Sequence, residues 1–361
     1  MSNHTDIRRI VDISGHKLEQ GSSPFIIAEV GINHNGELEK AKEMVRVAKA
    51  AGVDVVKFQT FKAKEFVSDP TQEFTYKSQG KEVTESMLEM FQRNELSDDE
   101  WKSLKAYCDD QDMVFMSTPQ NLSDLDFLIQ FDLPAIKVGS DDFTNIPLLR
   151  SYAKKNIPMI VSCGMSDLSE TYQALEAIGT FEGFPTILLL CTSEYPTPPE
   201  SVNIMKLKSL EASFPGLVLG FSDHTQGSTA AIMAVAMGAT VFETHFTLDH
   251  NLPGPDHWFS KNPDELAQWC GSIRDAYKMK GTALVRPTKQ ELITKKEAQR
   301  KIVALKNIKK GELLSTDNIG MKRVSEGEGL SPSLYDSLIG KPANQAYCSG
   351  DKIVLLAPVS S

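Results

Sequence analysis

The chain has 361 residues, 41% hydrophobic and 24% charged, which is ordinary for a globular protein and long enough for one large domain with a smaller one. Its net charge of -10 argues against a nucleic acid or an anionic membrane as partner, and no apolar run is long enough to span a bilayer. Five cysteines without CxxC spacing, and a start without signal-peptide features, predict reduced thiols and a cytoplasmic location.

Short, β-branched apolar runs alternate with helix-like segments over the first 260 residues or so. The predicted strands are 25–30, 53–58, 113–117, 135–138, 159–162, 186–191, 217–221 and 240–242. Helix-like patterns between them include 37–51, 98–110, 167–178 and 228–237. Eight strand-helix repeats predict an α/β fold, a (β/α)8 TIM barrel over residues 1–285 with its working face at the carboxyl ends of the strands. A doubly wound open sheet, which usually has fewer strands, is the alternative.

Two segments of this region depart from the repeat. Residues 10–13 and 17–18 predict a short hairpin that closes the bottom of the barrel. The stretch 62–92 is too long for an ordinary barrel loop, and it is polar with interspersed aromatic residues. A long insertion after the functional end of a strand predicts a lid or binding loop.

The composition changes after Gly281. Residues 286–296 predict a charged connection between domains, and 297–361 contain short strand-like runs separated by glycine turns. The sequence therefore predicts a small, mostly-β second domain whose core would be marginal alone. We expect it to dock on a barrel or on a partner chain.

Two histidines follow adjacent predicted strands, twenty-one positions apart. His224 comes after the seventh strand and His245 after the eighth, so both rings should emerge on one rim, with Asp256 close behind. Neutral imidazole is a common ligand of divalent first-row metals. Two protein ligands leave positions for water and substrate, which favours Mn²⁺ or Mg²⁺ over a structural zinc.

Two lysines and several hydroxyl groups end the strands of the same rim. Lys57 and Gln59 alternate with Phe58, and Lys137 repeats the pattern on the fourth strand. Small hydroxyls follow strands three to six, at Thr118, Ser140, Ser162 and Ser193. Such groups together predict a receptor for phosphate or carboxylate. The alternative is that the lysines only pair with Glu29 and Asp142.

The end of the first strand carries a further carboxylate and a turn. Glu29 is suited to bind sugar hydroxyls or to transfer a proton, and the alternative is a salt-bridged rim residue. His34 is interpreted as fixing its loop rather than as a ligand, and Asn35-Gly36 as a turn with positive φ.

Four stretches together resemble the sialic acid synthase family, which includes N-acetylneuraminate, legionaminate and spore-coat-polysaccharide synthases. They are IAEVGINHNG at 27–36, VKFQT at 56–60, SDHT at 222–225 and PGPDH at 253–257. The tail, with IKKGE at 308–312 and MKR at 321–323, resembles the antifreeze-like (SAF) domain of that family. The resemblance covers the chain from about Phe25 onward.

The resemblance implies a condensation of phosphoenolpyruvate (PEP) with an open-chain N-acyl hexosamine, which gives a nine-carbon 2-keto acid and phosphate. It implies PEP contacts from Thr118, Lys137, Ser140, Ser162 and Ser193, and a metal, Mn²⁺ or Mg²⁺, on His224 and His245. It implies sugar contacts from Glu29, Lys57, Gln59, Tyr195, Asp256 and Arg323, and catalytic roles for Glu29, Lys57 and Asp142. It also implies a homodimer in which the small domain of one chain covers the barrel of the other.

The chain departs from the family pattern at three places. Asp141-Asp142 replaces Gly-Glu after the Lys-x-Gly-Ser motif, Ser193 replaces an Asn, and Val324 follows Arg323 in place of proline. The acceptor is therefore left open among N-acetylmannosamine, its phosphate and a diacetamido-trideoxyhexose. Two other functions are also left open: a class II metal aldolase that uses pyruvate, and a non-catalytic glycan-binding or ice-binding protein.

Overall fold

Eight strands of the large unit form one sheet in which every pairing is parallel, in the order β7-β4-β3-β12-β11-β10-β9-β8. Their bounds are β3 (Phe25–Gly31), β4 (Val55–Thr60), β7 (Val114–Pro119), β8 (Ile136–Val138), β9 (Met159–Ser162), β10 (Thr186–Cys191), β11 (Val218–Asp223) and β12 (Val241–His245). The end strands β7 and β8 also contact each other, so the sheet is nearly closed. The predicted (β/α)8 barrel is confirmed, and the open sheet is not what forms.

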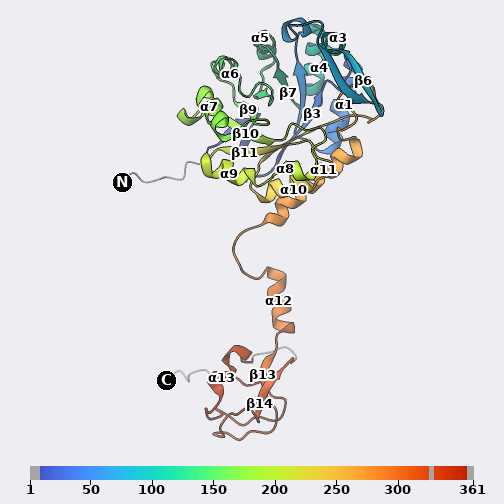
Figure 1. Cartoon of the computed structure of the whole chain (residues 1–361). Coiled ribbons are helices and arrows are strands. Elements are labelled where there is room, and N and C mark those ends of the chain that lie inside the picture. Colours follow the sequence, from blue (N-terminus) through green and yellow to red (C-terminus); the bar gives the residue numbers. More distant parts are fainter. Residues whose placement is uncertain (1–8, 325–328, 356–361) are drawn as a thin grey trace. The chain divides into compact units, whose positions relative to one another are not determined.

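Helices surround this sheet in the computed structural model, which describes residues 9–324 and 329–355 (Figure 1). They are α1 (Leu38–Ala51), α4 (Asp98–Asp110), α5 (Leu122–Leu128), α6 (Ile146–Ala153), α7 (Leu168–Ile178), α8 (Pro199–Val202), α9 (Lys206–Ser213), α10 (Thr229–Ala236) and α11 (Pro263–Lys280). Side-chain caps set several starts, for example the capping box of Ser97 with Glu100 at α4. Gly52 ends α1 with a φ of 89°, a conformation that glycine adopts without strain.

The interior of the barrel contains a layer of apolar side chains from alternate strand positions. Its buried members include Ile27, Val55, Met116, Ile160 and Val241. Because side chains of a strand alternate between its two faces, residues two positions later on each strand point into the same interior, nearer its carboxyl end. This alternation brings polar strand-end residues together above an apolar floor.

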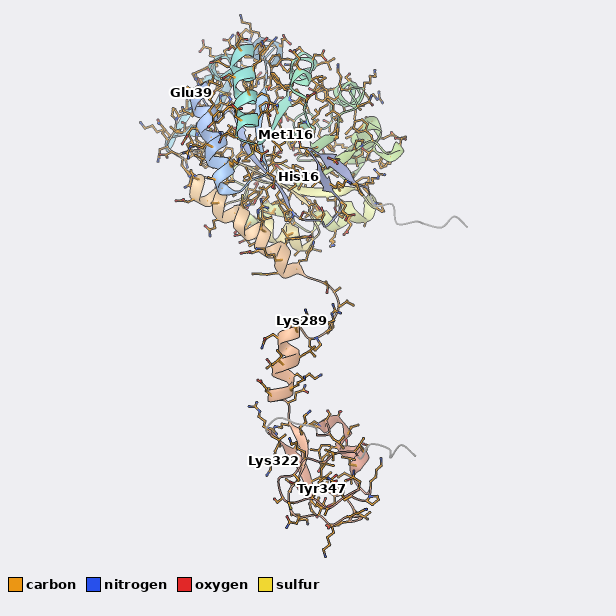
Figure 2. The ribbon with its side chains drawn as sticks, turned by 180° about the vertical axis from the view of Figure 1, so that it is seen from behind. His16, Glu39, Met116, Lys289, Lys322 and Tyr347 are labelled. Carbon is orange, nitrogen blue, oxygen red and sulfur yellow. The ribbon has the colours of Figure 1, made fainter. Side chains whose placement is uncertain are left out.

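A two-stranded hairpin packs against that layer. It pairs β1 (Val11–Ile13) with β2 (His16–Leu18), and Val11, Ile13 and Leu18 are buried in the same cluster as the interior residues. Figure 2 labels His16 of this hairpin and Met116 of the interior. The hairpin predicted at 10–13 and 17–18 therefore closes the barrel end opposite the polar residues.

The long segment after β4 has a structure of its own. It contains α2 (Ala63–Phe66), the antiparallel pair β5 (Glu73–Ser78) and β6 (Lys81–Ser86), and α3 (Met87–Asn94). Ser78 Oγ accepts a hydrogen bond from the backbone N–H of Gly254 at 3.2 Å, and Gln79 Nε2 donates to the carbonyl of Asn251 at 2.9 Å. The predicted binding loop is thus a hairpin that is joined to the loop after β12.

The chain divides into two units, Met1–Gly281 and Thr282–Ser361. The second contains α12 (Lys289–Ala298), the antiparallel strands β13 (Lys301–Ala304) and β14 (Ile319–Lys322), η3 (Pro332–Leu334) and α13 (Tyr335–Leu338). Its small core includes Ile302, Ile319 and Tyr347. Helix α12 lies across most of the predicted connection at 286–296. Over the residues that the structure describes, no helix is both long and apolar enough to cross a membrane.

Candidate active site at the carboxyl end of the barrel

A cavity of about 620 Å³ opens at the carboxyl ends of the strands. Its floor consists of the inward-facing residues that follow the apolar layer on each strand, as the alternation requires: Glu29, Lys57, Thr118, Lys137, Ser162, Cys191, Ser222 and Glu243. Its walls come from the loops that follow, and from the β5–β6 hairpin with the helices on either side of it. A concave site with convergent polar groups in this position is the expected location of an active site in a TIM barrel.

Two lysines and two glutamates form a buried cluster on this floor. Lys57 Nζ pairs with Glu29 Oε2 and lies 3.6 Å from Glu243 Oε2, while Lys137 Nζ lies 3.6 Å from Glu243 Oε1. All four side chains are almost fully buried. Glu243 thus stands between the two ammonium groups, where sequence reasoning had placed no residue.

Burial and pairing set the charges of this cluster. Burial raises the pKa of Glu29 to about 7, against the opposing effect of Lys57. Burial also disfavours the ionised form of Glu243, but Lys137 and Lys57 outweigh it and lower its pKa to about 2. Below pH 7 the cluster therefore holds two ammonium groups and one carboxylate, which leaves a positive charge for an anionic ligand.

Hydroxyl groups complete the cationic side of the cavity. Lys57 Nζ donates to Thr118 Oγ1 at 3.2 Å, and Lys137 Nζ donates to Ser162 Oγ and to the carbonyl of Val138, both at 2.9 Å. Ser193 Oγ is buried and has no hydrogen-bond partner among the residues that the structure describes. An unsatisfied buried hydroxyl that faces a cavity is the kind of group that a ligand satisfies.

Gly164 allows two of these hydroxyls to approach each other. A Cβ atom at this position would lie 2.5 Å from Ser193 Oγ and 2.6 Å from Ser140 Oγ. The backbone N–H of Gly164 also donates to Ser140 Oγ at 3.0 Å. Any larger residue would push the two serines out of the cavity, so glycine maintains this part of the site.

The two histidines lie side by side on the adjacent wall. The ring centroids of His224 and His245 are 5.3 Å apart, and both rings line the cavity. His224 Nδ1 lies 2.9 Å from the carbonyl of Thr192, which can only accept, so Nδ1 carries a proton and, in the neutral ring, Nε2 has the free lone pair. Burial opposes protonation of His224, but Cys191 and the Thr192 carbonyl outweigh it and raise the pKa of the ring. Burial and the nearby His224 lower the pKa of His245 well below its usual value, which keeps that ring neutral.

This arrangement fits an open metal site. His245 Nδ1 is buried, has no hydrogen-bond partner within the described part of the chain, and lies 3.9 Å from Asp256 Oδ2. No group of three or more His, Cys, Asp or Glu side chains within residues 9–324 and 329–355 is arranged to hold a metal by itself. Two imidazoles with a nearby carboxylate are donors that suit a divalent ion whose other positions are taken by water and substrate oxygen.

The remaining wall combines polar groups with aromatic rings. Gln59 Nε2 donates to Glu29 Oε1 at 3.2 Å, and the Tyr195 ring lies 4.3 Å from the His224 ring. Lys77 of the β5–β6 hairpin places its Nζ 4.6 Å from the centre of the Trp258 ring. These groups present donors, acceptors and apolar faces together, as recognition of an acylated sugar requires.

The structure brings most of the predicted site residues together. The cavity is lined by every predicted PEP and metal residue, and by every predicted sugar residue of the first unit; Arg323 belongs to the second unit, where it is exposed. Asp142 does not line it: its Oδ1 accepts from Asn145 Nδ2 at 2.9 Å, and Asp141 lines the cavity instead.

The same geometry bears on the partners of the lysines, on His34 and on Glu243. The lysines do have carboxylate partners, but the second is Glu243 rather than Asp142. His34 fixes its loop by accepting from the backbone N–H of Gly36 at 3.1 Å, and it does not line the cavity. Glu243 was detectable in the sequence, because it lies two positions before His245 and so shares its face.

Comparisons with known proteins agree with this geometry. The NeuB family model matches residues 44–284. An N,N'-diacetyllegionaminic acid synthase of Campylobacter jejuni is 39% identical, over 90% of this chain and 96% of that protein. The human N-acetylneuraminate-9-phosphate synthase is 34% identical, over 88% of each chain. The crystal structure of an N-acetylneuraminic acid synthetase from Leptospira borgpetersenii, 27% identical, matches with a TM-score of 0.71 and covers 82% of this chain and 99% of that one.

Proposed function

The chain belongs to the NeuB family of sialic-acid-type synthases, and on that premise we propose that it condenses PEP with an open-chain N-acyl hexosamine. The products are a nine-carbon 2-keto sugar acid and phosphate. One observation carries the proposal: a pair of buried lysines and a pair of adjacent histidines line the same cavity. The first pair suits an anion, and the second suits the metal that an aldehyde acceptor needs.

PEP binds on the lysine side of the cavity. Lys137 donates to Ser162 Oγ in the free protein, and Ser193 Oγ has no partner among the described residues. Both groups can donate hydrogen bonds to phosphate or carboxylate oxygens. Thr118 and Ser140 line the same side. The positive charge of the cluster below pH 7 draws the anion in, and the lost hydration of the lysines is replaced by contacts to its oxygens.

The acceptor binds between the lysines and the histidines. Glu29, Gln59, Tyr195 and Asp256 surround this space and offer hydrogen bonds to sugar hydroxyl and amide groups. A divalent ion on His224 and His245 would polarise the aldehyde and stabilise the alkoxide that forms from it. The same chain provides an acid for that oxygen in Glu29, whose pKa of about 7 keeps a proton available near neutral pH.

The reaction balances without a further reagent. C3 of PEP bonds to the aldehyde carbon, water adds at C2, and cleavage of the C–O bond releases phosphate and leaves the 2-keto group. Lys57, held beside Glu29 and 3.2 Å from Thr118 Oγ1, lies where the two substrates meet. It stabilises negative charge as it passes from PEP to the acceptor.

An acceptor panel tests the proposal. The full-length protein is incubated with PEP, Mn²⁺ and N-acetylmannosamine, its 6-phosphate or a diacetamido-trideoxyhexose, while phosphate is assayed and products are identified by mass spectrometry. We expect equimolar phosphate and keto acid with one acceptor. The surface variant Lys155→Met, which loses only an exposed pair with Asp126, is the matched control and should keep full activity. Absence of both products over the panel would contradict the proposal.

The same assay separates the other functions. A metal aldolase would form product from pyruvate without phosphate release. A glycan-binding protein would show affinity for the sugar without turnover. Buried charges at the cavity floor disfavour the latter, because a scaffold does not require an electrostatically costly interior.

We further propose that the active form is a homodimer in which Arg323 of one chain completes the sugar site of the other. Arg323 is exposed, directly after β14. Mixing Arg323→Ala with His245→Ala tests this, since half of the sites in each mixed dimer would be intact. Random exchange should restore roughly a quarter of wild-type activity from two inactive proteins. Absence of recovery despite confirmed exchange would place Arg323 outside the partner's site.

A further inference from the structure

The pairing of β11 with β12 ends just before the two histidines. The last paired residues are Asp223 and Thr244, and Thr244 Oγ1 donates to the carbonyl of Asp223 at 2.9 Å. His224 and His245 are the next residues on each chain segment. Their separation is therefore not fixed by the sheet ladder between these strands and depends on contacts beyond it.

Lys261 contacts both segments at this point. Its backbone N–H donates to the carbonyl of His245, and its own carbonyl accepts from Thr247 N–H, both at 2.9 Å. Its Nζ reaches across and donates to the carbonyl of Thr225, the residue after His224, also at 2.9 Å. One residue thus joins the two histidine-bearing segments, one through its backbone and the other through its side chain.

The Lys261 side chain is costly to keep in this position. It is 6% exposed and forms no ion pair with a carboxylate among the described residues. Its Nζ has the Trp269 ring at 5.7 Å, and Trp269 Nε1 donates to Asp223 Oδ2 at 2.9 Å, so the ammonium lies against the network behind His224. Removal of an ammonium group from water is unfavourable, and an apolar side chain would fill this space without that penalty. That a lysine occupies this position despite the unfavourable burial indicates a role for its contact with Thr225.

We propose that Lys261 is a positioning residue that sets the separation of His224 and His245, and thereby the affinity of the site for Mn²⁺. The inference rests on the proposed function, because it takes those rings as metal ligands. Groups that orient metal ligands change metal affinity by about 10- to 100-fold when removed. Lys261 acts on the backbone beside both ligands, so about tenfold is the expected effect.

The test compares three variants in calorimetric titrations with Mn²⁺ alone. Lys261→Met keeps the length of the side chain and removes its donor, and Lys261→Arg restores a donor. Thr186→Val is the matched control: it removes a buried hydroxyl contact with Thr180 at 2.8 Å, at the opposite end of the barrel. We expect about tenfold weaker binding in Lys261→Met, partial recovery in Lys261→Arg and wild-type binding in Thr186→Val, even where the melting temperature falls equally.

Hydrogen exchange without metal supplies the second readout. Residues 222–226 should exchange several-fold faster in Lys261→Met than in Thr186→Val, because only the first variant loses the contact with the Thr225 carbonyl, while residues 244–247 keep their backbone contacts with residue 261 in both variants. Equal Mn²⁺ affinity in Lys261→Met and wild type would overturn the inference and leave the proposed function intact. Failure of the wild type to bind Mn²⁺ would instead count against the proposed function. The exchange data would then test the role of Lys261 by themselves, and unchanged exchange in Lys261→Met would overturn that role.

Discussion

Lys137→Met gives the sharpest test of the anion site. In the free protein, Lys137 Nζ lies 3.6 Å from Glu243 Oε1 and donates to Val138 O and Ser162 Oγ. At an effective dielectric constant of about 20, an ion pair at that distance is worth about 5 kcal/mol. Loss of hydration costs each ion several kcal/mol, so the pair contributes little net stability.

The substitution should therefore act on binding more than on folding. Glu243 keeps its second ammonium, Lys57, at 3.6 Å, so it is not left without a cation. We expect a loss of about 1–3 kcal/mol in the free energy of unfolding, which a folded barrel tolerates. One charge-assisted hydrogen bond to PEP is worth about 1.5–3 kcal/mol, which corresponds to a rise in the KM for PEP of roughly 10- to 150-fold.

Steady-state kinetics with PEP as the varied substrate measure this effect. Lys137→Arg keeps the charge and is the comparison for size, while a Mn²⁺ titration checks that the histidine side is unchanged. A KM for PEP within about twofold of the wild type in Lys137→Met would refute the reasoning, because a lysine that binds no anion gains nothing to offset its burial.

Three further predictions concern other parts of the cavity. Burial raises the pKa of Glu29 from 4.5 to about 7, so the native state binds this proton more tightly than the unfolded state does. Between pH 4.5 and pH 7 the wild type should therefore lose up to about 3 kcal/mol of its free energy of unfolding relative to Glu29→Gln. Urea unfolding measures this difference, and parallel stability curves for the two proteins would contradict the prediction. His224→Ala and His245→Ala should each abolish turnover and Mn²⁺ binding while circular dichroism stays unchanged; activity at wild-type level in either variant would exclude the metal site. Asp141 lines the cavity and Asp142 does not, so Asp141→Asn should lower kcat/KM for the acceptor by about fivefold and Asp142→Asn by less than twofold, and the reverse order in the same kinetics would assign the role to Asp142.

The hydrophobic pattern locates the strands but not their functional ends. Strand β4 was predicted at 53–58 and lies at Val55–Thr60, and β12 was predicted to end at 242 but continues to His245. Val53 looks like a strand residue because it is apolar, yet it packs in the layer shared with the helices. At the other end, Gln59 is polar because it lines the site, whereas Thr60 faces away from the site and its Oγ1 lies 2.7 Å from Ser117 Oγ, so apolar periodicity stops at the end of the strand.

The sequence predicted which residues line the cavity where their direction depends on one strand position, and it was incomplete where their direction depends on a loop. Lys57, Lys137 and the two histidines follow from alternation alone. Asp141 and Asp142 are neighbours in a loop, and their directions depend on the contact of Asp142 with Asn145, which no periodicity encodes. Lys261 escaped notice for the same reason: its partners are backbone atoms 16 and 36 positions away.

The β1–β2 hairpin closes the end of the barrel opposite the candidate site. Val11, Ile13 and Leu18 pack beneath the apolar layer, while every residue of the candidate site lies above it. Engineering for heat tolerance can therefore begin at the sealed end, where better-filling aliphatic side chains would raise the melting temperature and leave reaction kinetics untouched. The protein can therefore be stabilised for use as a catalyst in synthesis at positions that do not contact the reacting groups.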